Sequence, residues 1–139
     1  MMIIDAKNAV AGRLASAVVK KLLLGEKIVI INAEQAIMTG NPADIRNKYI
    51  AQKRRGSPFH GPFFPKKPEH ILRRIIRGML PYKKPKGRNA MRRLKVYYGF
   101  PKNLEARHVV VAEQSIREIR SRYMTIGELA KSLGWNQSV

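Results

Sequence analysis

The residues best suited to chemistry are the arginines and lysines in the middle of the chain. Arg73, Arg74 and Arg77 fall on one side of a predicted helix, and a guanidinium group can hold a phosphate through two parallel hydrogen bonds. The pattern predicts binding to nucleic-acid phosphates. The residues that we expect to make these contacts are Lys53, Arg54, Arg55, Lys66, Lys67, Arg73, Arg74, Arg77, Lys83, Lys84, Lys86, Arg88, Arg92, Arg93 and Lys95.

Side chains that usually carry catalysis are few and scattered. The histidines His60, His70 and His108 lie in a proline-rich loop, at the start of a predicted helix and at the start of a predicted strand, without the spacing of a metal site. The chain has no cysteine, which excludes disulfides and thiolate chemistry. Acids that could hold metal ions for phosphodiester cleavage are also scarce. We therefore expect no enzymatic activity, no metal and no cofactor.

One glycine lies where nucleotide-binding folds place a phosphate loop. Gly12 and Arg13 follow a predicted strand and open a predicted helix. The stretch lacks the Gly-Lys-Ser/Thr ending of such loops, so the match is weak. Tight packing is the expected reason for Gly12, and Arg13 could equally be a surface residue.

The positive charge is confined to one segment. Of the 28 Lys and Arg residues, 18 lie between Arg46 and Lys102, where Glu69 is the only acid, so this stretch carries +17 of the total charge of +19. A solvated surface normally mixes both signs, so the segment indicates a nucleic-acid partner. The bases are spread over a helix, two loops and a turn, and no helix-turn-helix, zinc-finger or basic-zipper pattern appears. This layout favours folded RNA over duplex DNA.

The nearly neutral N-terminal flank is predicted to form a βαβ unit. Residues 3–4 form a short strand, Asn8 is expected to cap a helix over residues 9–24, and Gly25 ends that helix. Residues 27–32 contain consecutive β-branched side chains, which is typical of a parallel strand buried on both faces.

The basic segment is predicted to begin with a helix capped by Asn41 and to continue through a proline-rich extended loop over residues 57–68. A second helix starts at Pro68 and ends at Pro81. Its apolar side is predicted to hold Ile71, Leu72, Ile75, Ile76 and Met79. A lysine-rich turn over residues 81–88 and a short helical piece over residues 90–94 follow.

The aromatic residues of the proline-rich loop allow two interpretations. Phe59, His60, Phe63 and Phe64 could stack on unpaired bases, but such side chains more often cover a hydrophobic core. We favour the core interpretation and keep stacking as the alternative.

The C-terminal flank returns to near neutrality. Residues 108–112 are predicted to form a second central strand, and Thr125 with Glu128 has the capping-box spacing of a short helix that Gly134 stops. Trp135 is expected to fold back onto the body. With 139 residues and 45% apolar content, we expect one domain over residues 1–139, with its basic segment at about 46–102, and neither a secretion signal nor a membrane span.

Three blocks of sequence match a known pattern. The blocks are Ile4 to Ser16, Ile31 to Glu34 followed by Met38 to Asn41, and Arg77-Gly78-Met79-Leu80-Pro81 with Gly87-Arg88 and Arg93 to Gly99. Together they resemble the universal large-subunit ribosomal protein family L-thirteen, over about residues 3–135. The closing segments 127–130 and 133–135 are similar to the archaeal and eukaryotic branch, and an archaeal-type member fits best.

The resemblance implies a three-layer α/β/α fold on a four-stranded, mostly parallel sheet with a basic, loop-rich insertion. It also implies a structural role in the large ribosomal subunit in the cytoplasm, bound to large-subunit ribosomal RNA early in assembly and to neighbouring ribosomal proteins. No enzymatic activity, membrane or small-molecule substrate is implied. Two alternatives from other classes are an RNA-modifying or RNA-processing enzyme and a DNA-packaging protein.

Overall fold

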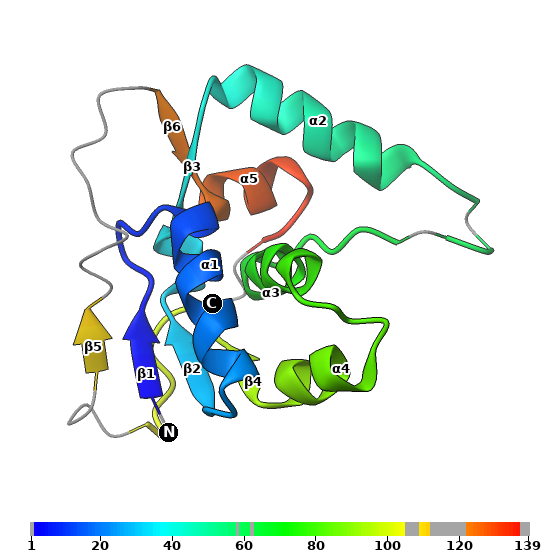
Figure 1. The fold of residues 1–139 in the computed structure, drawn as a ribbon. Coiled ribbons are helices and arrows are strands. Elements are labelled where there is room, and N and C mark those ends of the chain that lie inside the picture. Colours follow the sequence, from blue (N-terminus) through cyan, green and yellow to red (C-terminus); the bar gives the residue numbers. More distant parts are fainter. Residues whose placement is uncertain (1, 58, 62, 105–108, 112–121, 137–139) are drawn as a thin grey trace.

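The computed structural model describes residues 2–57, 59–61, 63–104, 109–111 and 122–136. Strands and helices are interspersed along these residues (Figure 1). In chain order the elements are β1 Met2–Asp5, α1 Ala11–Leu23, β2 Ile28–Ile31, the 3-10 turn η1 Ala33–Gln35, β3 Ile37–Thr39, α2 Pro42–Arg54, α3 Pro68–Met79, α4 Pro85–Arg92, β4 Leu94–Val96, β5 Val109–Val111, β6 Tyr123–Thr125 and α5 Ile126–Ser132.

A parallel sheet lies at the base of the fold. Its strands run in the order β4-β2-β1-β5, and each neighbouring pair is parallel. The unit β1-α1-β2 confirms the predicted βαβ arrangement, and every residue of β2 is buried, as its β-branched run predicts. Strand β5 falls within the predicted strand 108–112, whose end residues His108 and Ala112 lie outside the described residues. The mixed α/β class with a parallel sheet is confirmed.

The main hydrophobic core lies between one face of this sheet and the helices α1, α3 and α4. Ile28 and Ile30 of β2 face this core, where α1 and α3 contact each other. The alternate residues Ile3, Val29 and Ile31 face the other way and are also buried. Side chains on both faces of the sheet are therefore buried, and α1, α3 and α4 lie on one face.

Helix α1 ends as its sequence predicts. Gly25 has a φ of 95°, in the left-handed region that glycine adopts without steric cost. Its N–H donates to the carbonyl of Leu22 at 3.1 Å, and the N–H of Glu26 donates to that of Lys21 at 3.2 Å. This pair of hydrogen bonds is the Schellman motif, which satisfies carbonyls at the helix end.

The predicted start of α1 is wrong. The helix begins at Ala11, and no side chain caps it. Asn8 instead has a φ of 61°, and its N–H donates to the carbonyl of Gln35 at 3.2 Å. The cause is a turn between β1 and α1, which is closed by a hydrogen bond from the N–H of Ala9 to the carbonyl of Ala6. Asparagine tolerates the left-handed conformation that this turn requires at position 8.

The reason expected for Gly12 is also wrong. Gly12 is exposed in the first turn of α1, and a β-carbon there would meet no atom within 4 Å. Close packing therefore does not require glycine at this position.

The basic segment starts with the predicted cap. The side chain of Asn41 accepts a hydrogen bond from the N–H of Ala43 at 3.1 Å, and Pro42 is the first residue of α2. Helix α3 begins at Pro68, also as predicted. Its last residue, Met79, was expected on the apolar side but is 45% exposed, whereas Leu80 is 4% exposed. The backbone becomes extended at Leu80, so the helical periodicity no longer holds there.

Helix α4 begins earlier than predicted. It spans Pro85–Arg92, so half of the lysine-rich stretch expected to be a turn is helical. Pro85 takes the first helical position, where its missing N–H costs nothing. A β-carbon on Gly87 would lie 2.0 Å from the carbonyl oxygen of Pro81, so only glycine lets α4 approach the turn this closely.

Strands β3 and β6 form a small antiparallel pair, and α5 follows directly after β6. The capping box predicted at the start of α5 is present, with Thr125 and Glu128 each accepting from the other's N–H. Gly134 follows the helix with a φ of 99°, and Trp135 folds back so that 8% of it is exposed. These predictions for the C-terminal flank are confirmed.

Candidate nucleic-acid interface

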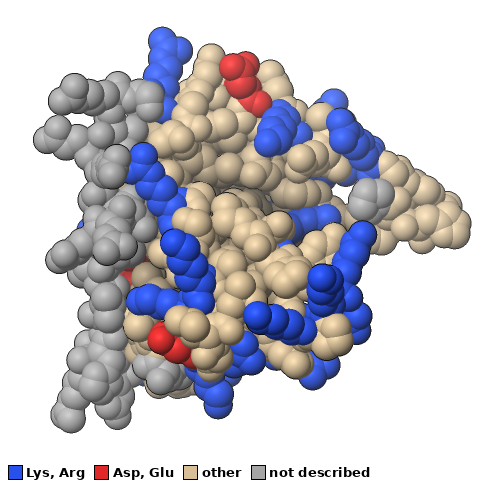
Figure 2. Space-filling view, viewed as in Figure 1, with Lys and Arg blue, Asp and Glu red and all other residues tan. Residues whose placement is uncertain are grey.

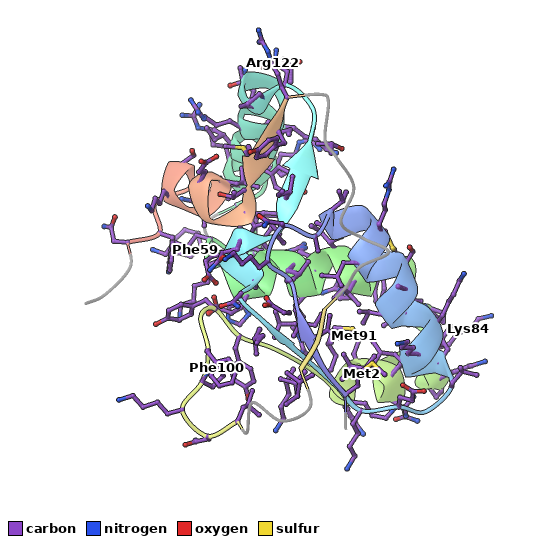
Figure 3. All side chains as sticks on the ribbon, turned by 90° about the vertical axis from the view of Figure 1, so that its left-hand side faces the viewer. Met2, Phe59, Lys84, Met91, Phe100 and Arg122 are labelled. Atoms are coloured by element: carbon purple, nitrogen blue, oxygen red, sulfur yellow. The ribbon has the colours of Figure 1, made fainter. Side chains whose placement is uncertain are left out.

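The first part of the basic segment projects to one side of the molecule. Helix α2 leads into the proline-rich loop, which runs outward and returns to α3 (Figure 1). Lys and Arg side chains gather beside this projection and over α4, with few acids on the same face (Figure 2). Lys84, just before α4, lies at the outer edge of the molecule, and Phe100, in the loop after β4, lies at the opposite side of that view (Figure 3).

Two hollows lie between the loop and α3. One, of about 310 Å³, is lined by Gln52, Arg55, Phe64 and Arg74. The other, of about 290 Å³, is lined by Phe63, Pro65, His70, Arg73, Arg74, Arg77 and Met91. The second hollow unites the predicted arginine row with a histidine and an aromatic ring.

The three arginines of α3 make different contacts. Arg73 donates to the carbonyls of Leu94 at 2.8 Å and Met91 at 3.3 Å. These bonds tie α3 to the end of α4 and the start of β4. The guanidinium of Arg73 is therefore already engaged by protein carbonyls.

Arg74 and Arg77 are more open. Arg74 donates to the carbonyl of Phe63 at 3.0 Å, and its guanidinium lies 5.0 Å from the ring centre of Phe64. Arg77 is exposed, and its guanidinium lies 4.5 Å from the ring centre of Tyr82. A guanidinium that lies over an aromatic ring can still donate N–H groups to a phosphate.

Two other predicted contact residues also bond to carbonyls. Lys53 donates through Nζ to the carbonyl of Leu133, just after α5. Arg93 donates to the carbonyl of Leu22 at 2.6 Å, in the last turn of α1, while its Nε is buried with no partner among the described residues. Cations near helix C-termini complement the free carbonyls there, so both residues contribute to the fold.

The remaining predicted contacts form an exposed set. They lie at the end of α2, in the loop before α3, on α3 and along α4 with its flanks. They are Arg54, Arg55, Lys66, Lys67, Arg77, Lys83, Lys84, Lys86, Arg88, Arg92 and Lys95.

The aromatic residues of the proline-rich loop do not all fit the same interpretation, core packing or base stacking. Phe64 is partly buried and packs edge-to-face on Tyr49 at 5.3 Å between ring centres, which matches the core interpretation. Burial raises the pKa of the Tyr49 phenol, so that this side chain packs in its neutral form. Phe59 and Phe63 are 88% and 68% exposed, which leaves base stacking as a prediction for these two rings.

Sequence reasoning missed His70 as a companion of the arginines. Its spacing of three, four and seven residues before Arg73, Arg74 and Arg77 puts it on the same helical face, and this signal could have found it. The loop after β4 was also missed, where Tyr97, Tyr98 and Phe100 are each more than a third exposed.

Two other kinds of site are absent from the part of the chain that the structure describes. Within the described residues, no group of three or more His, Cys, Asp or Glu side chains could hold a metal ion. None of the helices that the structure describes is long and apolar enough to cross a membrane.

Comparison with known proteins decides the family. The family model described as ribosomal protein L13 matches residues 1–103, from β1 through the whole basic segment. The chain belongs to the ribosomal protein L13 family. It is 48% identical over 139 aligned residues to the large ribosomal subunit protein uL13 of Methanocaldococcus jannaschii, covering 96% of this chain and 98% of that protein. The proteins of the same name from Methanopyrus kandleri and Methanosarcina barkeri are each 46% identical to this chain. Each alignment covers 96% of this chain. It covers 86% of the Methanopyrus protein and 98% of the Methanosarcina protein. The archaeal type that the sequence suggested is confirmed.

The third block that carried the resemblance in the sequence includes the junction of α3 and α4. Arg77 stacks on Tyr82 in the turn, Gly87 touches the carbonyl of Pro81, and Arg88 donates to the carbonyl of Lys83 at 2.8 Å. The block therefore fixes a compact turn that bears exposed cations.

Proposed function

We propose that this chain is a structural constituent of the large ribosomal subunit that binds folded ribosomal RNA through its basic segment, residues 46–102. One observation carries the proposal. Besides Lys53, eleven predicted contact residues are exposed between the end of α2 and β4, on a chain whose relatives are named as large-subunit proteins. Cations gathered on one side of a fold with so few acids need an anionic partner, and phosphate supplies it.

We expect different groups of exposed cations to contact different parts of the RNA backbone. Arg54 and Arg55 act at the entrance of the loop, and Arg77 acts from the face of α3. The cations on α4 and its flanks contact an irregular RNA backbone that cations on one straight helix could not follow. Lys53, Arg73 and Arg93 act mainly by holding these elements in position, because their donors bond to carbonyls of other helices and strands that are distant in sequence.

The proposal includes the finer fold implied by the family, a three-layer α/β/α arrangement on a four-stranded parallel sheet. Burial supports the third layer, since Ile3, Val29 and Ile31 are at most 3% exposed on the face opposite α1 and α3. Leu104 is the described apolar side chain that packs against them.

Family membership supports a non-enzymatic role in cytoplasmic ribosomes, with neighbouring ribosomal proteins as further partners. It gives no support to an RNA-processing enzyme or a DNA-packaging protein.

Sedimentation of cell extracts tests the proposal. The wild-type chain should co-migrate with the large subunit at high salt. The double variant Lys83→Glu/Lys86→Glu should enter subunits several-fold less, because two exposed cations of the α4 region are reversed. The matched control is Lys7→Glu/Lys27→Glu, which makes the same charge change at exposed positions of the neutral flank. A wild-type pool that stays free of subunits would contradict the proposal, as would equal incorporation of both double variants.

A further inference from the structure

The second of the two hollows between the proline-rich loop and α3 combines apolar and cationic walls. Phe63, Pro65 and Met91 line it together with His70 and the three arginines of that helix, and none of the described residues that line it is an acid. Its volume of about 290 Å³ lies just below the range of roughly 300–1,000 Å³ that small-molecule sites span. The hollow therefore has room for a single small group and not for a length of RNA helix.

Phe63 is an exposed ring on a fixed backbone. It is 68% exposed, although burial of a phenylalanine ring would stabilise the fold. The carbonyl of Phe63 accepts a hydrogen bond from Arg74 at 3.0 Å, which ties its backbone to α3. Directly after it, Phe64 packs on Tyr49 and against the main core. The chain is thus held on both sides of a ring that remains open to solvent.

Gly61 packs against the Phe63 ring. Its φ is 73°, and a β-carbon there would lie 3.1 Å from a carbon of that ring. Two hydrogen bonds between the backbones of Gly61 and Ser57, at 2.9 and 3.3 Å, hold this glycine in place. The ring therefore lies close against an ordered backbone. A base can stack on such a preorganised ring with little further loss of conformational entropy.

Donors for a phosphate line the same hollow. His70, Arg74 and Arg77 follow one another at spacings of four and three residues, so they share one face of α3. His70 and Arg77 are exposed. Arg74 bonds to the Phe63 carbonyl through Nη1, and a guanidinium has five N–H donors in all. Proteins that bind single-stranded nucleic acid combine aromatic rings with cations in this way.

We propose that this hollow binds one unpaired nucleotide of the RNA, with its base stacked on Phe63 and its phosphate held by His70, Arg74 and Arg77. A base inside a duplex has both faces covered by its neighbours, so only an unpaired base can stack on the ring. Every base has a π-face, so stacking favours no single base. The inference rests on the proposed function, because the nucleotide belongs to the bound RNA, and it adds a preference for unpaired RNA.

Two RNA probes separate stacking from phosphate contacts. One is a single-stranded oligouridylate and the other is a fully paired RNA duplex of the same length, each bound to the full chain at one salt concentration. Phe63→Leu should weaken binding to oligouridylate about ten-fold in a filter-binding assay, which corresponds to about 1.4 kcal/mol and is typical of one base stacked on an aromatic ring. Its affinity for the duplex should stay within about two-fold of wild type, because the cations are unchanged.

Two further variants show whether the ring itself is responsible. Phe63→Tyr keeps an aromatic ring at this exposed position and should keep the wild-type affinity for oligouridylate. Tyr123→Leu removes a ring that is 50% exposed on β6, in the neutral C-terminal flank, and should also keep it. Unchanged oligouridylate binding in Phe63→Leu, or an equal loss for both probes, would overturn the inference. A loss of the same size in Phe63→Tyr or Tyr123→Leu would overturn it as well.

Binding of the wild-type protein to large-subunit ribosomal RNA separates this inference from the proposed function. Wild-type protein that fails to bind ribosomal RNA contradicts the proposed function. Wild-type protein that binds ribosomal RNA, while Phe63→Leu binds oligouridylate as tightly as wild type, contradicts the inference alone.

Discussion

Arg73, Arg74 and Arg77 occupy one helical face but have different partners. Helical periodicity predicts that face correctly, because it depends only on residue spacing. It cannot predict that Arg73 reaches the carbonyl of Leu94, since this partner lies in another element. The same limit applies to Arg93 and Lys53, whose acceptors are 71 and 80 residues away in sequence. Sequence thus identifies candidate cations, and the structure separates those that bond to carbonyls of distant elements from those that remain exposed.

Arg73 and Arg77 should separate stability from RNA binding. Arg73→Ala removes two hydrogen bonds from a charged donor to carbonyls, so unfolding free energy should fall by about 1–2 kcal/mol, measured by urea denaturation. Arg77→Ala removes an exposed side chain and should change unfolding free energy by less than about 0.5 kcal/mol. It should also weaken ribosomal RNA binding several-fold in a filter-binding assay. The opposite pattern, with Arg77 the more destabilising, would contradict this assignment of roles.

At the scale of elements, local signals predict most of the neutral flanks and less of the basic segment. The β-branched run of β2, the Asn41 cap and the capping box of α5 each follow from a few neighbouring residues. The start of α4 was missed because its lysines and Pro85 also suit a turn, and only contact with the preceding turn distinguishes the two. The start of α1 was missed because Asn8 serves the preceding turn instead.

Of the residues at the α3–α4 junction, Gly87 should tolerate substitution least. Gly87→Ala puts a β-carbon 2.0 Å from the carbonyl oxygen of Pro81, and the backbone must move apart. We expect a loss of about 1–3 kcal/mol in unfolding free energy, typical of overpacking. The control is Gly12→Ala, where a β-carbon meets no atom within 4 Å and alanine should stabilise α1 by up to about 1 kcal/mol. Thermal and urea unfolding measure both. A Gly87→Ala protein as stable as Gly12→Ala would show that the close approach is not required.

At the scale of the whole molecule, two neutral flanks fold into the α/β body and support one cationic segment. That segment is part of the fold, since Leu72, Ile76 and Leu94 lie in the main core. Its apolar side packs against the sheet, and its charged side remains exposed. Sequence predicts this division through the charge distribution alone, but it cannot predict which cations remain exposed.

The salt dependence of binding to large-subunit ribosomal RNA tests the central claim most directly. The logarithm of the wild-type affinity should fall steeply and linearly with the logarithm of salt concentration. Neutralising one exposed phosphate contact, as in Arg77→Gln or Lys83→Gln, should reduce the slope by about one. Lys7→Gln, an exposed flank residue, should leave the slope unchanged. A flat wild-type response, or slopes that do not differ between these variants, would contradict an RNA interface built from the exposed cations of residues 46–102.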